Sequence, residues 1–128
     1  MANCSFIAEV SSNHHRDLDR CLRFIDRAAE IGCGAVKFQL FKIGEIYTPE
    51  VLKQFEAEAK RRAEWELPEE FLPVIAEHCR KRRILFGCTA FSLAGVKTLR
   101  PYVDFYKVAS YELLWDDLLV ACASTGVS

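Results

Sequence analysis

The 128-residue sequence lacks the features that would assign it to a specialised class of protein. It has no apolar run of the roughly 20 residues that a membrane-spanning helix needs. The one apolar run near the start, residues 6–10, is interrupted by Glu9 and is too short for a signal peptide. We therefore expect a cytoplasmic chain without a membrane segment.

An excess of charge of either sign is also absent. The 17 Lys and Arg residues nearly balance 18 Asp and Glu residues, which leaves a net charge of -1 and no general attraction to nucleic acids or membranes. The most basic run, residues 80–83, falls where a predicted helix ends, and cations there complement the helix dipole. We predict no nucleic-acid partner.

The six cysteines form no Cys-x-x-Cys pair and show no zinc-finger spacing. Most of them stand in apolar surroundings, so we interpret them as reduced, buried thiols. With 51% hydrophobic and 27% charged residues, the composition is that of one globular domain. The cysteines are Cys4, Cys21, Cys33, Cys79, Cys88 and Cys122.

The most informative segment is Gly-Ala-Val-Lys-Phe-Gln-Leu-Phe at residues 34–41, which is short and apolar and therefore favours a buried strand. Lys37 and Gln39 are two residues apart, so in a strand they point to one face while the apolar residues between them point to the other. Burying a lysine and a carboxamide without partners is costly. The pair therefore either has buried structural partners or faces a polar cavity, and the sequence leaves both readings open.

Strand and helix patterns alternate along the chain. Residues 42–66 are polar and charged, and we interpret them as an excursion over the end of the sheet that contains one short helix. Pro73 is expected to delay or bend the following helix. Such alternation predicts a parallel sheet with helices packed outside it. Strands are predicted at residues 5–10, 34–41, 84–89 and 104–110, and helices at 18–31, 49–63, 68–82, 93–100 and 114–125.

Every predicted strand ends in at least one polar side chain. In a barrel of parallel strands the carboxyl ends meet at one mouth, so residues far apart in sequence would share a site. Two lysines with amide and hydroxyl groups suit phosphate and carboxylate, while two glutamates supply acid, base or hydroxyl-binding groups. Taken singly, each of these polar residues could equally have a purely structural role. The residues are Glu9, Lys37, Gln39, Thr89, Lys107, Ser110 and Glu112.

Four spaced motifs resemble the N-acetylneuraminate (sialic acid) synthase family. They run in order along nearly the whole chain, and Glu64-Trp65-Glu66-Leu67 between them also resembles a segment of this family. The motifs are Ala8-Glu9-Val10 with Asn13-His14, Val36-Lys37-Phe38-Gln39, Cys88-Thr89-Ala90-Phe91-Ser92, and Tyr106-Lys107-Val108-Ala109-Ser110 with Glu112.

The resemblance implies an α/β fold, a (β/α)8 TIM barrel of which this chain supplies about the first four βα units. It also implies condensation of phosphoenolpyruvate with an N-acetylated sugar such as N-acetylmannosamine, giving a sialic-type acid and phosphate with Mn or Mg as the divalent metal. Glu9 would lie beside the reacting enol and Glu112 toward the sugar and metal. Substrate-binding residues carried over from the family are Lys37, Gln39, Thr89, Lys107, Ser110, Asn13 and His14.

The sequence departs from the family in three respects. Ser11 and Arg16 stand where glycines are usual, so the first loop is open to a different path, and Ala90 replaces a proline. The chain is also short for a barrel of roughly 250 residues. We expect residues 1–128 to be the N-terminal half of a barrel, without the C-terminal antifreeze-like domain and with the metal-ligating histidines outside the chain.

Histidines within the chain offer no metal site of their own. His14 and His15 are adjacent and point in different directions, which favours a loop hydrogen bond for His14, and His78 is expected at the surface. As an isolated fragment the chain should be inactive, with open strand edges that favour pairing with another copy. Two alternatives stay open. One is a non-catalytic module that binds phosphoenolpyruvate or a related sugar acid, or only mediates assembly. The other is a different TIM-barrel enzyme of the aldolase type.

Overall fold

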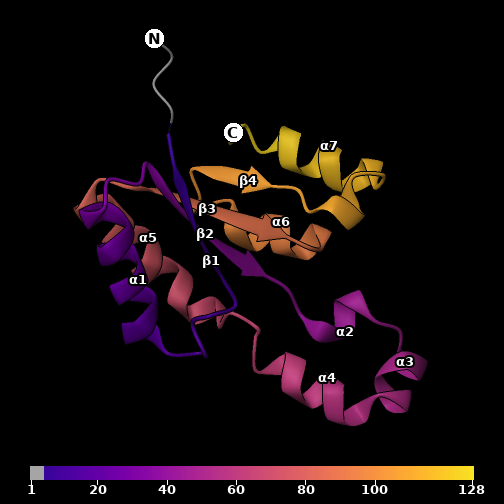
Figure 1. The fold of residues 1–128 in the computed structure, drawn as a ribbon. Coiled ribbons are helices and arrows are strands. Elements are labelled where there is room, and N and C mark those ends of the chain that lie inside the picture. The colour runs from indigo at the N-terminus through magenta and orange to yellow at the C-terminus, as the bar shows by residue number, and fades with distance from the viewer. Residues whose placement is uncertain (1–4) are drawn as a thin grey trace.

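A computed structural model describes residues 5–128, and Cys4 lies outside the described residues. Its centre is a four-stranded parallel sheet in the order β1-β2-β3-β4, so each strand pairs with its neighbour in sequence (Figure 1). The predicted parallel sheet is therefore confirmed. The strands are β1 (Ile7–Ser11), β2 (Ala35–Leu40), β3 (Leu85–Ala90) and β4 (Phe105–Lys107).

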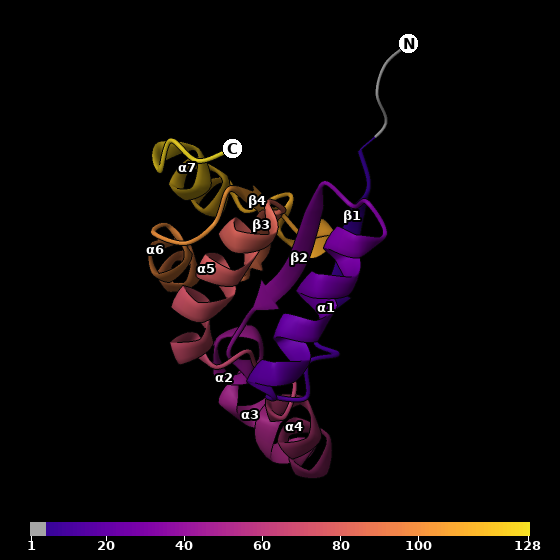
Figure 2. The same cartoon turned by 90° about the vertical axis from the view of Figure 1, so that its left-hand side faces the viewer.

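Four helices form a layer against one face of the sheet, and Figure 2 shows two of them, α1 and α5, beside β2. Asp17 caps α1 and Ser92 caps α6, because each side chain accepts a hydrogen bond from the backbone N–H three residues further on. The helices of this layer are α1 (Leu18–Glu30), α5 (Leu72–Arg82), α6 (Leu93–Leu99) and α7 (Asp116–Ser124).

The two faces of the sheet differ as the alternation in residues 34–41 predicts. Phe38 and Phe86 belong to the hydrophobic core that the helices cover, and their rings meet edge to face at 6.0 Å. On the opposite face, Ile7 is 54% exposed and Leu85 52% exposed. The sheet is thus covered on one side and open on the other, and Lys37 belongs to the open side.

The polar excursion is confirmed as a separate group of helices beyond the carboxyl end of β2 (Figure 1). The expectation of one helix over residues 49–63 was wrong, because the helical backbone is interrupted at Phe55, which has φ -120° and ψ 46°. The group contains α2 (Ile43–Ile46), α3 (Pro49–Gln54) and α4 (Glu56–Ala63). We call these helices and their connections, residues 43–63, the excursion.

Several element boundaries differ from the expected ones. A short 3-10 turn, η1 (Glu69–Phe71), precedes α5, which places Pro73 in the first helical turn, where its missing N–H leaves no bond unmade. The fourth strand was expected to reach residue 110 but ends at Lys107, because the chain turns into the 3-10 turn η2 (Ser110–Glu112).

His78 is not the surface residue that the sequence suggested. Its side chain is 24% exposed, and Nε2 lies 2.7 Å from Asp26 Oδ1 on α1. The contact links α1 to α5 on the outer side of the helical layer. Within residues 5–128, no helix combines the length and apolarity needed to cross a membrane.

Candidate anion site and cleft at the strand ends

The carboxyl ends of the strands bring three of the predicted site residues into direct contact. Lys37 Nζ lies 2.7 Å from Glu9 Oε2 and 3.0 Å from Thr89 Oγ1. The lysine side chain is 8% exposed, whereas that of Glu9 is 48% exposed. Lys37 therefore combines both possibilities that the sequence left open. It has a structural partner, Glu9, and that partner is half exposed on the open side of the sheet.

Strand register explains this arrangement. Glu9, Lys37 and Gly87 align across β1, β2 and β3 in one row, and Gln39, Thr89 and Lys107 align across β2, β3 and β4 in the next. Side chains of both rows leave the same face of the sheet, because residues two apart in a strand share a face. Groups that hydrogen-bond or carry positive charge therefore stand side by side at the end of the sheet.

Gly87 makes room on this face for an aromatic ring. A Cβ atom at this position would come within 2.1 Å of Phe105 Cζ, far inside contact distance. The absence of a side chain lets the Phe105 ring lie over Gly87, which pairs with Lys37 across β2 and β3. The ring adds an apolar surface to this face of the sheet.

A cleft of about 940 Å³ opens between the strand ends and the excursion. Three predicted site residues, Asn13, Gln39 and Glu112, line it. Oε2 of Glu112 is buried without a hydrogen-bond partner among residues 5–128, so this oxygen is free to accept a donor from a ligand. The further lining residues are Ser11, Ser12, His15, Phe41, Ile43, Ile46, Tyr47, Arg62, Trp65, Phe91 and Tyr111.

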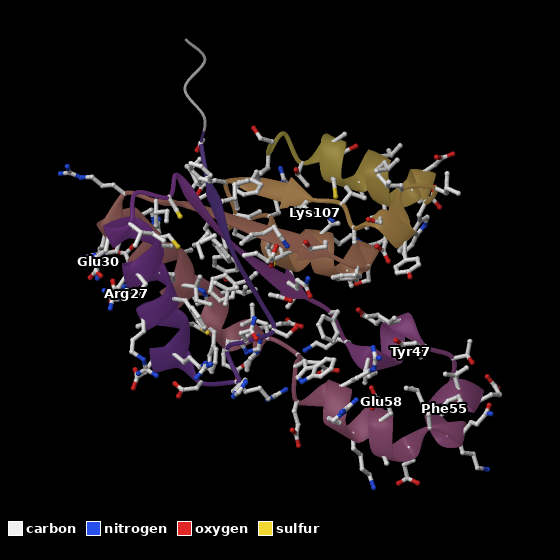
Figure 3. The ribbon with its side chains drawn as sticks, in the orientation of Figure 1. Arg27, Glu30, Tyr47, Phe55, Glu58 and Lys107 are labelled. Atoms are coloured by element: carbon white, nitrogen blue, oxygen red, sulfur yellow. The ribbon has the colours of Figure 1, made fainter. Side chains whose placement is uncertain are left out.

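The remaining predicted site residues lie outside this lining. Lys107 and Ser110 are exposed at and just after the end of β4, where Figure 3 labels Lys107. His14 is fully buried under the first loop, and its Nδ1 accepts a bond of 3.0 Å from the backbone N–H of Arg16. Burial, followed by the positive charges of Arg16 and His15, lowers the pKa of His14.

The first loop adopts the backbone conformation that glycine favours although it contains none. Ser11, His15 and Arg16 have φ values of 54°, 51° and 54°, in the left-handed region. Such a conformation costs a non-glycine residue about 1 kcal/mol or more. The loop therefore keeps a glycine-like path at both positions where the sequence departs from the family.

Arg16 connects this loop to the far side of the cleft. Its Nη1 donates to the carbonyl oxygens of Ala63 and Glu66 at 3.3 and 3.4 Å. The Glu66 carboxylate in turn accepts the backbone N–H of Ile43 at 2.7 Å. These contacts fasten both ends of the excursion, and sequence reasoning missed them because no local pattern relates residues 47 to 50 positions apart.

The excursion also supplies cleft residues that the sequence did not single out. Arg62 Nε donates to Glu58 Oε1 at 2.7 Å, and Nη1 donates to the Tyr47 hydroxyl at 3.0 Å. The guanidinium carbon lies 5.6 Å from the centre of a Trp65 ring and 5.8 Å from that of Tyr47. In the sequence, the only indication of this side of the cleft was Trp65, which belongs to the family-like segment Glu64-Trp65-Glu66-Leu67.

The described part of the chain does not form a metal site by itself. No group of three or more His, Cys, Asp or Glu side chains within residues 5–128 could hold a metal ion. Glu112 offers one buried carboxylate oxygen without a partner, and Glu9 is already paired with Lys37. A divalent metal would need ligands from other residues.

A parallel sheet in sequence order, with helices outside and polar side chains at the strand ends, defines the (β/α)8 barrel class, and this chain contributes four βα units. The profile of the NeuB family matches residues 24–128, and the chain belongs to this family. It is 31% identical over 114 residues to the spore coat polysaccharide biosynthesis protein SpsE of Bacillus subtilis, covering 84% of this chain and 31% of that protein.

Solved structures agree with this assignment. The N-acetylneuraminic acid (sialic acid) synthetase of Leptospira borgpetersenii, solved in complex with citrate, is 30% identical with a TM-score of 0.85, covering 98% of this chain and 43% of that one. A truncated 3-deoxy-D-arabino-heptulosonate 7-phosphate synthase of Thermotoga maritima, 14% identical, shares the fold with a TM-score of 0.65, covering 96% of this chain and 37% of that one. The chain spans about a third of the length of the curated relatives, 31% and 34%.

Proposed function

We propose that this chain carries the phosphoenolpyruvate-binding half of a sialic acid synthase-type barrel. The complete protein would condense phosphoenolpyruvate with an N-acetylated sugar aldehyde, giving a nonulosonic acid and phosphate. The observation that supports this most is the buried Lys37, held by Glu9 and Thr89 on the open face of the sheet. Family membership supports the same reaction class.

The residues of the site match the charges of this substrate. Phosphoenolpyruvate presents a phosphate and a carboxylate, and fixed cations in a poorly solvated site bind such anions more strongly than they would in water. Lys37 supplies a fixed cation, and Lys107, exposed at the end of β4, adds a second positive charge two strands away. Thr89 accepts a bond from Lys37, so its own hydroxyl proton is free to be donated to a substrate oxygen.

The proposed reaction begins with attack of the enol carbon on the sugar aldehyde, whose oxygen gains a proton. Water then adds to the carbon that bears the phosphate ester, and phosphate leaves from the tetrahedral intermediate to give the ketone. We assign the proton exchange at this carbon to Glu9, which is half exposed beside Lys37, and we assign Glu112, which lines the cleft, to contact with the sugar. No step is assigned to a metal, because the described residues do not form a metal site.

The contacts of Lys37 disfavour an aldolase that uses this lysine as its Schiff base. A Schiff-base lysine attacks as the neutral amine, whereas Lys37 is held in an ion pair with Glu9. Borohydride added with substrate would trap an adduct on an aldolase lysine and none on a synthase. The binding-module alternative predicts phosphoenolpyruvate binding but no condensation by the complete protein.

Calorimetry with phosphoenolpyruvate tests the proposal. We expect binding by the wild-type chain in EDTA and in Mn²⁺, because the anion site needs no metal, and loss of binding in the double variant Lys37→Ala, Lys107→Ala. Lys97→Ala is the matched control, since Lys97 is exposed on α6. No binding by a wild-type chain that circular dichroism shows to be folded would contradict the assigned anion site.

A further inference from the structure

We propose that Arg62, together with Tyr47 and Trp65, forms the subsite for the acceptor sugar, and that Arg62 is a specificity-determining residue. The inference rests on the proposed function, because it divides the same cleft into a phosphoenolpyruvate side and an acceptor side. The subsite would take a neutral, polyhydroxylated acylamino aldehyde.

The cleft has two walls of different chemistry. The strand-end wall presents Gln39 and Glu112, and Gln39 leaves β2 on the same face as Lys37, two residues before it. The opposite wall, formed by the excursion and the residues after it, presents Tyr47, Arg62 and Trp65. A ligand that fills the cleft therefore meets an amide and a carboxylate on one side and an aromatic and guanidinium surface on the other.

The excursion wall has the composition of a small-molecule site. Such sites combine aromatic surface with a few fixed polar groups. Trp65 is 37% exposed, and the guanidinium of Arg62 lies within cation–π distance of the rings of both Trp65 and Tyr47. Aromatic rings contact the C–H faces of a sugar, while guanidinium N–H groups donate to its hydroxyl and acyl oxygens.

Two hydrogen bonds fix the Arg62 side chain and leave other guanidinium N–H groups for a ligand. A guanidinium has five N–H groups, and the contacts to Glu58 and Tyr47 use two of them. The remaining three have no hydrogen-bond partner within the described part of the chain. Tyr47 and Glu58 come from different parts of the excursion (Figure 3), so the side chain is fixed from both.

The charges around Arg62 favour a neutral ligand over a free anion. Glu58 pairs with both Arg61 and Arg62. Arg61 is 63% exposed, so the excess positive charge of this trio lies in solvent. Arg62 therefore acts as a compensated, fixed donor, whereas Lys37 and Lys107 attract the anionic substrate.

The experiment titrates the full chain separately with phosphoenolpyruvate and with N-acetylmannosamine, the latter with and without saturating phosphoenolpyruvate. Arg62→Met keeps the apolar stem and removes the donors. Its matched control is Arg61→Met, because Arg61 contacts the same Glu58 and lies over Trp65 but does not line the cleft. We expect Arg62→Met to weaken sugar binding about tenfold or more, with phosphoenolpyruvate binding unchanged within about twofold and no effect of Arg61→Met.

The outcomes separate this inference from the proposed function. Sugar binding that is absent in the folded wild type, or that Arg61→Met and Arg62→Met weaken equally, overturns the subsite even if phosphoenolpyruvate binds. Sugar binding lost only in Arg62→Met supports the subsite, and it does so even if phosphoenolpyruvate fails to bind and the proposed function falls. Arg62→Lys refines the test: recovery of wild-type sugar affinity by a point charge would contradict the role of the guanidinium donors.

Discussion

The unequal burial of Lys37 and Glu9 leads to unequal effects when either partner is removed. In Lys37→Met the remaining carboxylate is 48% exposed and keeps most of its hydration, and the methionine fills the space of the lysine stem. The main loss is the contact to the buried Thr89 hydroxyl. We expect the free energy of unfolding to change by about 1 kcal/mol or less.

Glu9→Ala has the opposite consequence. The ammonium of Lys37, 8% exposed, then keeps Thr89 as its one partner among residues 5–128. Breaking a buried pair from one side costs about 3 to 5 kcal/mol. Because some solvent reaches this site, we expect a loss of about 2 to 4 kcal/mol.

Urea denaturation followed by circular dichroism measures both changes, and the double variant completes a cycle. Glu9→Ala in the Lys37→Met background should cost much less than in the wild type, because the stranded cation is gone. A loss of 3 kcal/mol or more in Lys37→Met, or equal costs for the two single variants, would refute the reasoning and make Lys37 a structural residue.

Three further outcomes follow from the loop and the core. The pKa of His14 is lowered from 6.5 in the folded chain, so as pH falls the unfolded chain binds a proton on this histidine before the folded chain does. Stability from this site should be complete above pH 6.5 and decline as pH falls below it, and His14→Asn should remove that part of the slope in denaturation midpoints. Arg16→Gly relieves a left-handed φ but loses two hydrogen bonds to backbone carbonyls, so we expect the free energy of unfolding to change by no more than about 1 kcal/mol. Limited proteolysis at residues 43–63 should become faster, because Arg16 no longer fastens the excursion; an unchanged rate would contradict this anchoring role. Burial raises the pKa of Cys21 to about 11 and of Cys79 to about 12, so iodoacetamide at pH 8 should label the half-buried Cys33 before Cys21 and Cys79, as mass spectrometry can follow; labelling of Cys79 before Cys33 would count against the described core.

The parts of the fold that followed from the sequence depend on short-range periodicity. Alternation in residues 34–41 fixed which face Lys37 and Gln39 share, because a strand has a period of two whatever its neighbours are. Asp17 and Ser92 were predictable as caps, because a cap bonds within its own first turn. Polar strand ends could be expected to meet because parallel strands end at one edge.

The parts that did not follow depend on contacts between distant, irregular segments. Nothing in the spacing of Arg16 relates it to the carbonyl of Glu66, and the break at Phe55 interrupts a segment whose composition favours one continuous helix. Arg62 appeared to belong to a solvated charged run, and only the folding of α2 against α4 brings it to Tyr47. The excursion wall of the cleft was therefore missed, while the strand-end wall was expected.

The most direct test of the account is the dissociation constant of phosphoenolpyruvate for wild-type chain and for Lys37→Met, measured in EDTA. Because this variant is expected to stay folded, loss of binding reports the anion site rather than the fold. We expect binding by the wild type and a loss of about tenfold or more in Lys37→Met. Equal affinity of the two folded chains would contradict the assignment of Lys37 as the centre of the site.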